Sequence, residues 1–285
     1  MSAGVVLAQR FPRVNASLGQ AHSRWRELGE QARFYGQTLG SLSDAFIRYR
    51  PELLRQIAML GMGAGSLAVI GGTVAVVTFL TVADSGALAS QGYNQLSQVG
   101  VEALTGFASA FVNTRAVTPA TAAIAFAATI GAGATAQLGA MRINEEIDAL
   151  EVMGIRSIPY LASTRVAAAM IVVVPLFCVA LLLGFASGQL VTTVLYGQSG
   201  GVYAHYFRTF FIRGDALKSF LVTIVEVMVI MLIHTYYGFN AYGGPAGVGE
   251  AVGRATRLSL IAAVFVILFV TLALYGQTGN FNFAG

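Results

Sequence analysis

The chain has little charge, one cysteine and one lysine, and each shortage excludes a class of protein. Only 11% of its 285 residues are charged, against 56% that are hydrophobic, and the mean hydropathy is +0.69. Soluble domains carry about a quarter charged residues, so this composition excludes an ordinary water-soluble globule. The single cysteine, Cys178, excludes an internal disulfide framework and a cysteine-based metal site. A net charge of +4 is too small to indicate a nucleic-acid partner.

The shortage of lysine and the scatter of histidine also bear on catalysis. Lys218 is the single lysine and follows Leu217, so the chain lacks the Gly-Lys-Ser/Thr of a phosphate-binding loop. HExxH and CxxC are absent, and the three histidines lie in different segments. We therefore expect no catalytic residue, no metal site and no cofactor bound directly. If ATP drives this protein, another subunit binds it.

What the sequence does contain is long apolar runs. A membrane span needs about 20 mostly apolar residues. Five stretches qualify, at roughly 58–82, 117–140, 165–195, 216–238 and 257–275. The prediction is an all-α integral membrane protein with five transmembrane helices, in which residues 1–56 precede a transmembrane domain at 57–285. Residues 84–116 are expected to connect the first two spans. The apolar part of that segment, 101–112, is too short to cross by itself, and a helix that dips into the membrane there is the alternative.

The region before the first span is rich in arginine and has an apolar stripe. Its apolar and aromatic side chains recur at spacings of three and four, which is typical of one face of a helix. They are Trp25, Leu28, Ala32, Tyr35, Leu39, Leu42, Phe46 and Tyr49. Such a helix is suited to the plane of the lipid headgroups, although packing against a soluble partner is the alternative. We expect Gly29, Gly36 and Gly40 to break it.

The basic residues are distributed unequally between the two sides of the predicted membrane. Thirteen of the 17 lie in segments on the same side as the amino terminus, and four lie on the other side. The positive-inside tendency therefore places the amino terminus in the cytoplasm and the carboxyl terminus outside, after an odd number of spans.

Two spans have unusual side chains. Residues 120–140 are dense in alanine, glycine and threonine, which favours close helix contact at the bundle centre or at a subunit interface. Glu226 and His234 lie in the fourth span, eight residues apart and on roughly one face. A carboxylate near mid-bilayer costs roughly 2.5–3.5 kcal/mol on insertion scales, so Glu226 is expected to face a partner helix or a wet path. Both interpretations remain open.

An acidic segment between the second and third spans is the most informative motif. Residues 139–155 read GAMRINEEIDALEVMGI and predict a short amphipathic helix at about 141–154. The acidic side chains are Glu145, Glu146, Asp148 and Glu151, the apolar stripe includes Leu150, and Met153 and Gly154 close the segment. An acidic helix on the cytoplasmic side favours a basic partner surface over a merely solvated face.

This motif resembles the signature of the MlaE/YrbE permease family, the membrane subunits of ABC transporters that act on lipids together with MCE-domain proteins. The resemblance extends to the element from Arg115 to Pro119 and to the glycine-rich residues 237–251. Ala116, Thr129 and Gln137 depart from charged residues that many members have. In these departures the chain is most similar to the YrbE subunits of actinobacterial (mycobacterial) Mce systems.

The resemblance implies an MlaE-like fold with an interfacial amino-terminal helix, five spans and a cytoplasmic coupling helix. It implies a multi-pass permease of the bacterial inner membrane that moves a fatty acid, mycolic acid, sterol or phospholipid. The direction of transport that the resemblance suggests is import. The implied partners are a second, non-identical YrbE-type permease, a cytoplasmic ATPase dimer that binds ATP and Mg²⁺, and MCE-domain proteins on the periplasmic side.

The implied sites fall into two groups. The residues of the acidic segment, Glu145 to Gly154, match the coupling helix. Arg115, Pro119, Gln137, Glu226 and His234 are candidates for a substrate path or a helix interface. The alternative to an ATP-driven permease is a proton-coupled secondary transporter or channel that uses Glu226 and His234.

Overall fold

The computed structural model describes residues 12–62 and 67–275, so the first 11 residues of the predicted amino-terminal region, four residues of the predicted first span and residues 276–285 lie outside the described residues. The described residues contain no strand. The helices are α2 (Pro12–Gly40), α3 (Leu42–Ile47), α4 (Arg50–Met62), α5 (Leu67–Ser97), η1 (Glu102–Leu104), α6 (Thr105–Ala108), η2 (Ser109–Val117), α7 (Thr118–Phe126), η3 (Ala127–Gly131), α8 (Ala132–Ile143), α9 (Glu146–Val152), η4 (Ile158–Ser163), α10 (Thr164–Leu190), η5 (Val191–Leu195), α11 (Gly200–Phe210), α12 (Arg213–Phe239) and α13 (Gly244–Tyr275).

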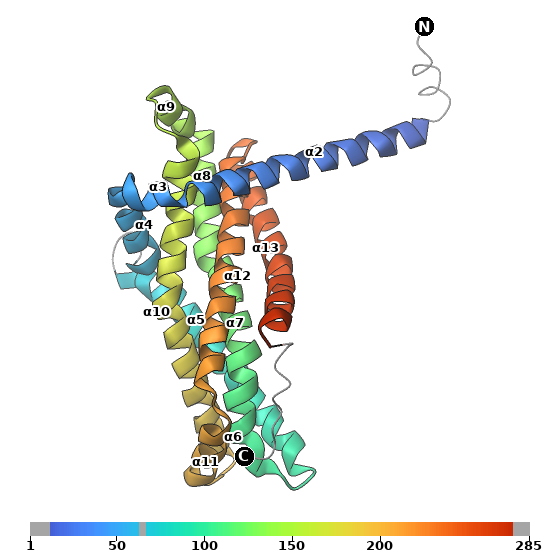
Figure 1. Cartoon of the computed structure of the whole chain (residues 1–285), viewed down its shortest axis with the longest axis vertical. Coiled ribbons are helices and arrows are strands. Elements are labelled where there is room, and N and C mark those ends of the chain that lie inside the picture. The colour runs from blue at the N-terminus through green and yellow to red at the C-terminus, as the bar shows by residue number, and fades with distance from the viewer. Residues whose placement is uncertain (1–11, 63–66, 276–285) are drawn as a thin grey trace.

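The long helices form one bundle together with α7 and α8, and α3, α6, α9 and α11 lie at its two ends (Figure 1). α2 crosses the end at which α9 projects, whereas α6 and α11 lie at the opposite end. Five helical segments are long and apolar enough to span a membrane: Gly72–Ser97, Glu102–Ile143, Ile158–Leu195, Arg213–Phe239 and Gly244–Tyr275. The prediction of an all-α membrane protein with five spans is confirmed.

The boundaries of the first two spans differ from the prediction. α5 continues to Ser97, well beyond the expected end near 82, and the second span begins at Glu102 rather than 117. Polar side chains allow this because they bond between helices: Thr121 donates to Asp84 at 2.8 Å, and Ser85 donates to Asn113 at 2.9 Å. Most of residues 84–116, expected as a connection, therefore belong to the end of α5 and the start of the second span, which form a helical hairpin.

The small-residue helix lies in the core of the bundle. Ala123, Ala127 and Ala134 are buried with side chains of α10 and α12 in the largest apolar cluster. Small residues allow the backbones to approach closely: a Cβ added at Gly238 of α12 would lie 2.9 Å from the Thr135 carbonyl oxygen of α8. This packing of α7 and α8 against α12 sets the position of the polar residues described below.

The amino-terminal helix is longer than expected. α2 passes through Gly29 and Gly36 and ends at Gly40, so the predicted breaks at the first two glycines are wrong. Packing against the bundle offsets the low helix propensity of glycine, because Phe34 is buried against Tyr236 and Phe239, each with ring centroids 5.5 Å away.

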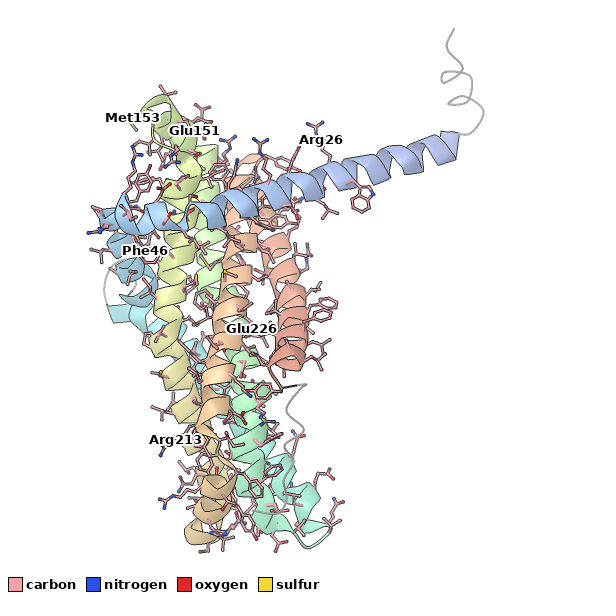
Figure 2. All side chains as sticks on the ribbon, viewed as in Figure 1. Arg26, Phe46, Glu151, Met153, Arg213 and Glu226 are labelled. Carbon is pink, nitrogen blue, oxygen red and sulfur yellow. The ribbon has the colours of Figure 1, made fainter. Side chains whose placement is uncertain are left out.

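The predicted apolar stripe of α2 and α3 is divided: Tyr35 and Leu42 pack against the largest apolar cluster of the bundle, whereas other members are exposed. Trp25 is 74% exposed and Phe46 is 47% exposed. Figure 2 shows Arg26 pointing to the side on which α9 projects. An exposed apolar stripe on a helix that crosses the end of a membrane bundle has the form of an interfacial helix.

Candidate functional site

The acidic segment forms α9, a short helix at one end of the bundle. Glu145 precedes it with a left-handed backbone (φ 59°), which turns the chain sharply after α8, and Gly154 ends it at φ 78°. Ile147 is fully buried and packs with Leu138 and Leu161, while Leu150 lies half-buried beside them. One face of α9 is therefore fastened to the ends of the second and third spans.

The outer face of α9 combines charge with apolar surface. Val152 is 90% exposed and Met153 is 67% exposed, and Glu145 and Glu146 are exposed beside them. Figure 2 shows Met153 and Glu151 at this end of the molecule. Exposed large apolar side chains next to carboxylates are typical of a surface that a protein partner covers.

Two of the four predicted carboxylates are engaged within the chain. Arg142 donates to Asp148 at 2.6 Å, and Ser157 donates to Glu151 at 2.5 Å. The acidic stripe expected from spacing is thus divided: Glu145 and Glu146 face outward, whereas Asp148 and Glu151 fix α9 to its flanking segments.

The segment after α9 is also tied to the amino-terminal helices. Arg156 pairs with Asp44 of α3 at 2.7 Å, and Ser163 donates to the Thr38 carbonyl oxygen at 2.9 Å. A cavity of about 450 Å³ lies between these elements and is lined by residues of both, including Ser41 and Ser157. A displacement of α9 would be transmitted to α3 through these contacts.

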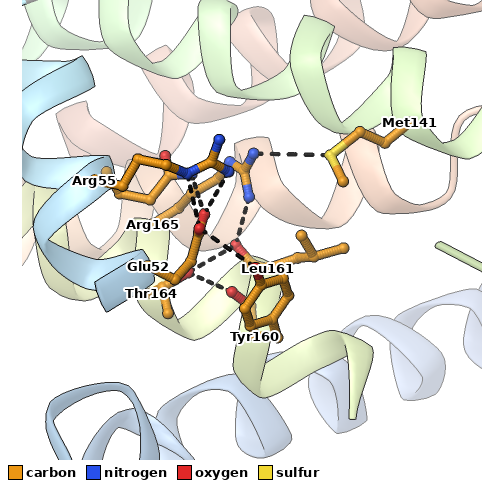
Figure 3. A network of polar contacts seen from close by, with 8 residues as sticks. Glu52, Arg55, Met141, Tyr160, Leu161, Thr164 and Arg165 are labelled. Atoms are coloured by element: carbon orange, nitrogen blue, oxygen red, sulfur yellow. Dashed lines mark hydrogen bonds and ion pairs between the residues drawn. The ribbon is translucent and has the colours of Figure 1, made fainter. Parts of the chain in front are cut away.

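A buried polar network joins α4 to α10 near the same end (Figure 3). Glu52 is 6% exposed and accepts hydrogen bonds from Arg55 at 2.8 Å and Gln56 at 2.7 Å. Burial by itself would raise the pKa of Glu52, but these hydrogen bonds and the charges of Arg55 and Arg165 outweigh it and hold the pKa below its ordinary value. Arg165, expected at the start of the third span, is buried and donates to the Leu161 carbonyl oxygen at 3.0 Å.

Three of the predicted path residues do not lie together. Arg115 is at the end opposite to α9, where its Nε donates to Asp215 at 2.8 Å and its guanidinium lies 4.6 Å from the ring centre of Tyr275. Pro119 is buried in the first turn of α7, and Gln137 is exposed on α8. Arg115 therefore joins the start of α12 to the end of α13.

His234 is held on both sides of its ring. Thr135 of α8 lies 2.7 Å from Nδ1, and Ser259 of α13 lies 3.1 Å from Nε2. One consistent assignment has Thr135 donating to Nδ1, Nε2–H donating to Ser259, and Ser259 donating to the Thr256 carbonyl oxygen at 3.0 Å. Each ring nitrogen then has a partner, so His234 connects three helices.

Glu226 is as deeply buried as His234 but has no hydrogen-bond partner. It is 1% exposed, and neither carboxyl oxygen has a partner among the described residues. Glu226 borders a small cavity of about 60 Å³ that is otherwise lined by apolar side chains of α7 and α13. Figure 2 shows Glu226 at middle height, between α12 and α13.

Comparison with known proteins decides which class of membrane protein has these features. The family model for the permease MlaE matches residues 63–273, about three quarters of the chain. The chain belongs to the MlaE permease family. It is thus a non-catalytic membrane subunit of an ABC transporter, a type of transporter whose ATP is hydrolysed by partner subunits.

Relatives of this MlaE-family permease occur in several lineages. A probable ABC transporter permease protein of Synechocystis is 26% identical over 81% of this chain and 84% of the relative. One of Rickettsia bellii is 26% identical over 85% and 92%. The chloroplastic protein TRIGALACTOSYLDIACYLGLYCEROL 1 of Arabidopsis thaliana is 27% identical over 66% of this chain, which spans about half the length of that protein.

Some contacts of this MlaE-family permease were not predicted from its sequence. The pair of Asp44 with Arg156 joins residues 112 positions apart, and Thr135 and Ser259 meet His234 from two other helices. The sequence does contain a pattern that could have located one helix face: from 116 to 140, every fourth residue is alanine except Ile124. This recurrence predicts one uniform helix face, and the structure shows that face exposed or half-exposed.

Proposed function

We propose that the chain is one of two membrane subunits of an ABC transporter that moves lipid, and that α9 is the coupling helix on which the ATPase acts. The observation that carries the proposal is the outer face of α9, where Val152 and Met153 are exposed beside Glu145 and Glu146. A basic, partly apolar groove on an ATPase subunit would complement this face.

The anchoring of α9 supports a mechanical role. Its inner face is packed against the ends of two long spans through Ile147, and the ion pair of Arg156 with Asp44 connects the following segment to α3. A push on the outer face would therefore move spans and interfacial helix together, as in the displacement of packed elements between discrete arrangements.

The substrate is proposed to be a membrane lipid. The family assignment and the Arabidopsis relative, which is named after a galactolipid, support this class. Import across the bacterial inner membrane, with MCE-domain proteins on the periplasmic side, follows the resemblance to actinobacterial YrbE subunits. The cytoplasmic position of α9 and the amino terminus follows the distribution of basic residues.

The test is charge reversal on the outer face of α9. The double variant Glu145→Lys/Glu146→Lys should reduce ATP-dependent transfer of a fluorescent phospholipid in proteoliposomes at least about tenfold, because basic residues would oppose a basic partner. The matched control is Glu27→Lys/Glu30→Lys on α2, which makes the same charge change on exposed residues away from α9. Equal transfer by both variants would overturn the assignment of α9.

The proton-coupled alternative is less consistent with the geometry. Glu226 and His234 are eight positions apart on α12, which corresponds to about 12 Å along the helix axis. Thr135 and Ser259 occupy both nitrogens of His234. Transport that continued without ATP and followed an imposed proton gradient would restore this alternative.

A further inference from the structure

A lateral groove runs between α4, α5 and α10, on the side of the bundle away from α13 (Figure 1). Its volume is about 370 Å³, and it is lined by Ile57 and Gly61 of α4, by Val74 of α5 and by apolar residues of α10. Sites for small molecules typically have volumes of about 300–1,000 Å³. The groove is therefore large enough for a ligand, and the part of the ligand that enters it must be apolar.

The groove is elongated and opens toward the lipid. Along α10 its lining extends from Ile171 to Val179, which is about 12 Å along the helix axis. These two side chains are 39% and 37% exposed, whereas Val172 at the floor is buried in the largest apolar cluster of the bundle. The floor is thus closed by packed side chains. An acyl chain that enters sideways from the bilayer fits this shape.

A basic residue lies on the line of α4 that leads into the groove. Arg50 is seven positions before Ile57 and eleven before Gly61, so the three residues share one face of α4. Arg50 is exposed, and its Nε donates to the Phe46 carbonyl oxygen at 2.7 Å, which directs its side chain toward α3. Arg50 takes part in no ion pair among the described residues. Its charge can therefore attract an anion from outside the chain.

The position of Arg50 relative to the groove matches the thickness of one leaflet. From Arg50 to Gly61 the axis of α4 extends about 16 Å, and half of the hydrocarbon core of a bilayer is about 15 Å. α3, directly before Arg50, has the exposed apolar side chains Phe46 and Ile47 that suit the headgroup level. A phospholipid with its phosphate at this level would have an acyl chain at the depth of the groove.

We propose that the groove binds an acyl chain of an anionic phospholipid from the leaflet on the α9 side, with the phosphate of that lipid at Arg50. Arg48 is exposed two positions before Arg50 and adds a second positive charge, which favours a headgroup with a net negative charge. The proposal goes beyond the proposed function, because this lipid is resident: the closed floor holds it at the side of the bundle and does not pass it inward.

The first experiment measures occupancy without ATP and without partner subunits, so its result does not depend on the proposed function. The full chain is placed in phosphatidylethanolamine vesicles that contain phosphatidylglycerol with a diazirine in one acyl chain, and adducts are located by mass spectrometry. Ile57 and Leu176 should be labelled at least about fivefold more than Leu268, which is exposed on α13, because the two arginines retain the headgroup. Equal labelling, or equal labelling of the groove by phosphatidylethanolamine with the same acyl chain, would overturn the proposal.

The headgroup end is tested by removing one charge. Arg50→Gln should lower labelling of the groove by phosphatidylglycerol about fivefold, which is the effect of one basic residue near an anionic headgroup. Arg26→Gln is the matched control, since Arg26 is also exposed on the α9 side but lies on α2, away from the groove. Unchanged labelling in Arg50→Gln, or an equal decrease in Arg26→Gln, would overturn the assignment of the phosphate to Arg50.

The acyl-chain end is tested by filling the groove. A Cβ added at Gly61 meets only Cγ2 of Val172, at an ordinary contact distance of 3.6 Å, so Gly61→Leu should fold and place its side chain in the groove. This variant should lose the labelling of Leu176. Gly72→Leu is the matched control, because Gly72 is exposed on α5 and a Cβ there meets no atom within 4 Å. Full labelling of Leu176 in Gly61→Leu would overturn the proposal.

The last experiment asks what occupies the groove in the full complex. A benzophenone amino acid is placed at Val179, which lines the groove and is part-exposed, and the complex is irradiated in native membranes with and without ATP. A resident lipid should give a phospholipid adduct at the same yield in both conditions. An adduct with a membrane protein would show that a partner helix covers the groove, and a yield that changes with ATP would indicate a transported lipid. Either result would overturn the proposal.

Discussion

His234 and Glu226 lie on the same helix, two turns apart, and both are almost completely buried. Their surroundings differ. At His234, α8 and α13 each supply a hydroxyl, so both ring nitrogens are bonded. At Glu226, α7 and α13 supply only apolar side chains.

The two buried polar residues of α12 therefore differ in whether they have hydrogen-bond partners among the described residues. The hydrogen bonds of His234 with Thr135 and Ser259 hold α12, α8 and α13 together. Glu226, in contrast, has no hydrogen-bond partner among the described residues. A buried ionisable residue in a membrane helix therefore indicates an internal or an external partner only after its neighbours are known.

The largest expected effect comes from breaking the complete site sterically. A Cβ added at Gly131 would lie 2.6 Å from Cδ2 of His234, whose ring is fixed on both sides. We expect Gly131→Val to lower the free energy of unfolding of the isolated chain by about 3 kcal/mol through overpacking. Reversible unfolding in detergent measures this loss.

A glycine two residues away provides the matched control. A Cβ added at Gly133 meets no atom within 4 Å, so Gly133→Val should cause no loss of stability. If Gly131→Val and Gly133→Val had the same free energy of unfolding, close packing against His234 would not be the cause of the loss.

A smaller effect is expected when the hydrogen bonds of His234 are removed. His234→Leu loses two bonds between helices, each worth about 1 kcal/mol, so the free energy of unfolding should fall by about 1–2 kcal/mol. Glu226→Leu removes no hydrogen bond among the described residues and should cause no such fall. A loss of equal size in both leucine variants would show that the two regions do not differ in the way the contacts indicate.

Much of the fold could be predicted because membrane spans depend on run length alone. The five apolar runs predicted five spans, and the 3.6-residue periodicity with its acidic residues predicted α9. The extension of α5 past Asp84 could not be predicted, since it depends on a hydrogen bond from Thr121 in another helix.

The polar sites were less predictable, because their character depends on residues far away in the sequence. Spacing placed Glu226 and His234 on one face of α12. It did not show that Ser259 contacts His234 and not Glu226. Similarly, the glycines of α2 predicted breaks, and packing of Phe34 on Tyr236 and Phe239 overrides that local preference.

Glu52 is a glutamate that is buried like Glu226 but has hydrogen-bond partners like His234. Hydrogen bonds from Arg55 and Gln56 hold its pKa below the ordinary value, despite burial. A lowered folded-state pKa contributes stability at pH values above the unfolded-state pKa, and that contribution is lost as the pH falls through the folded-state value. The unfolding free energy of the wild-type chain should therefore fall more steeply below about pH 4.5 than that of Glu52→Gln, by on the order of 1 kcal/mol or less. Glu30→Gln, on an exposed ion pair of α2, should follow the wild type. Superimposable pH profiles for wild type and Glu52→Gln would show that a partner within the chain does not stabilise a buried carboxylate here, and would weaken the contrast with Glu226.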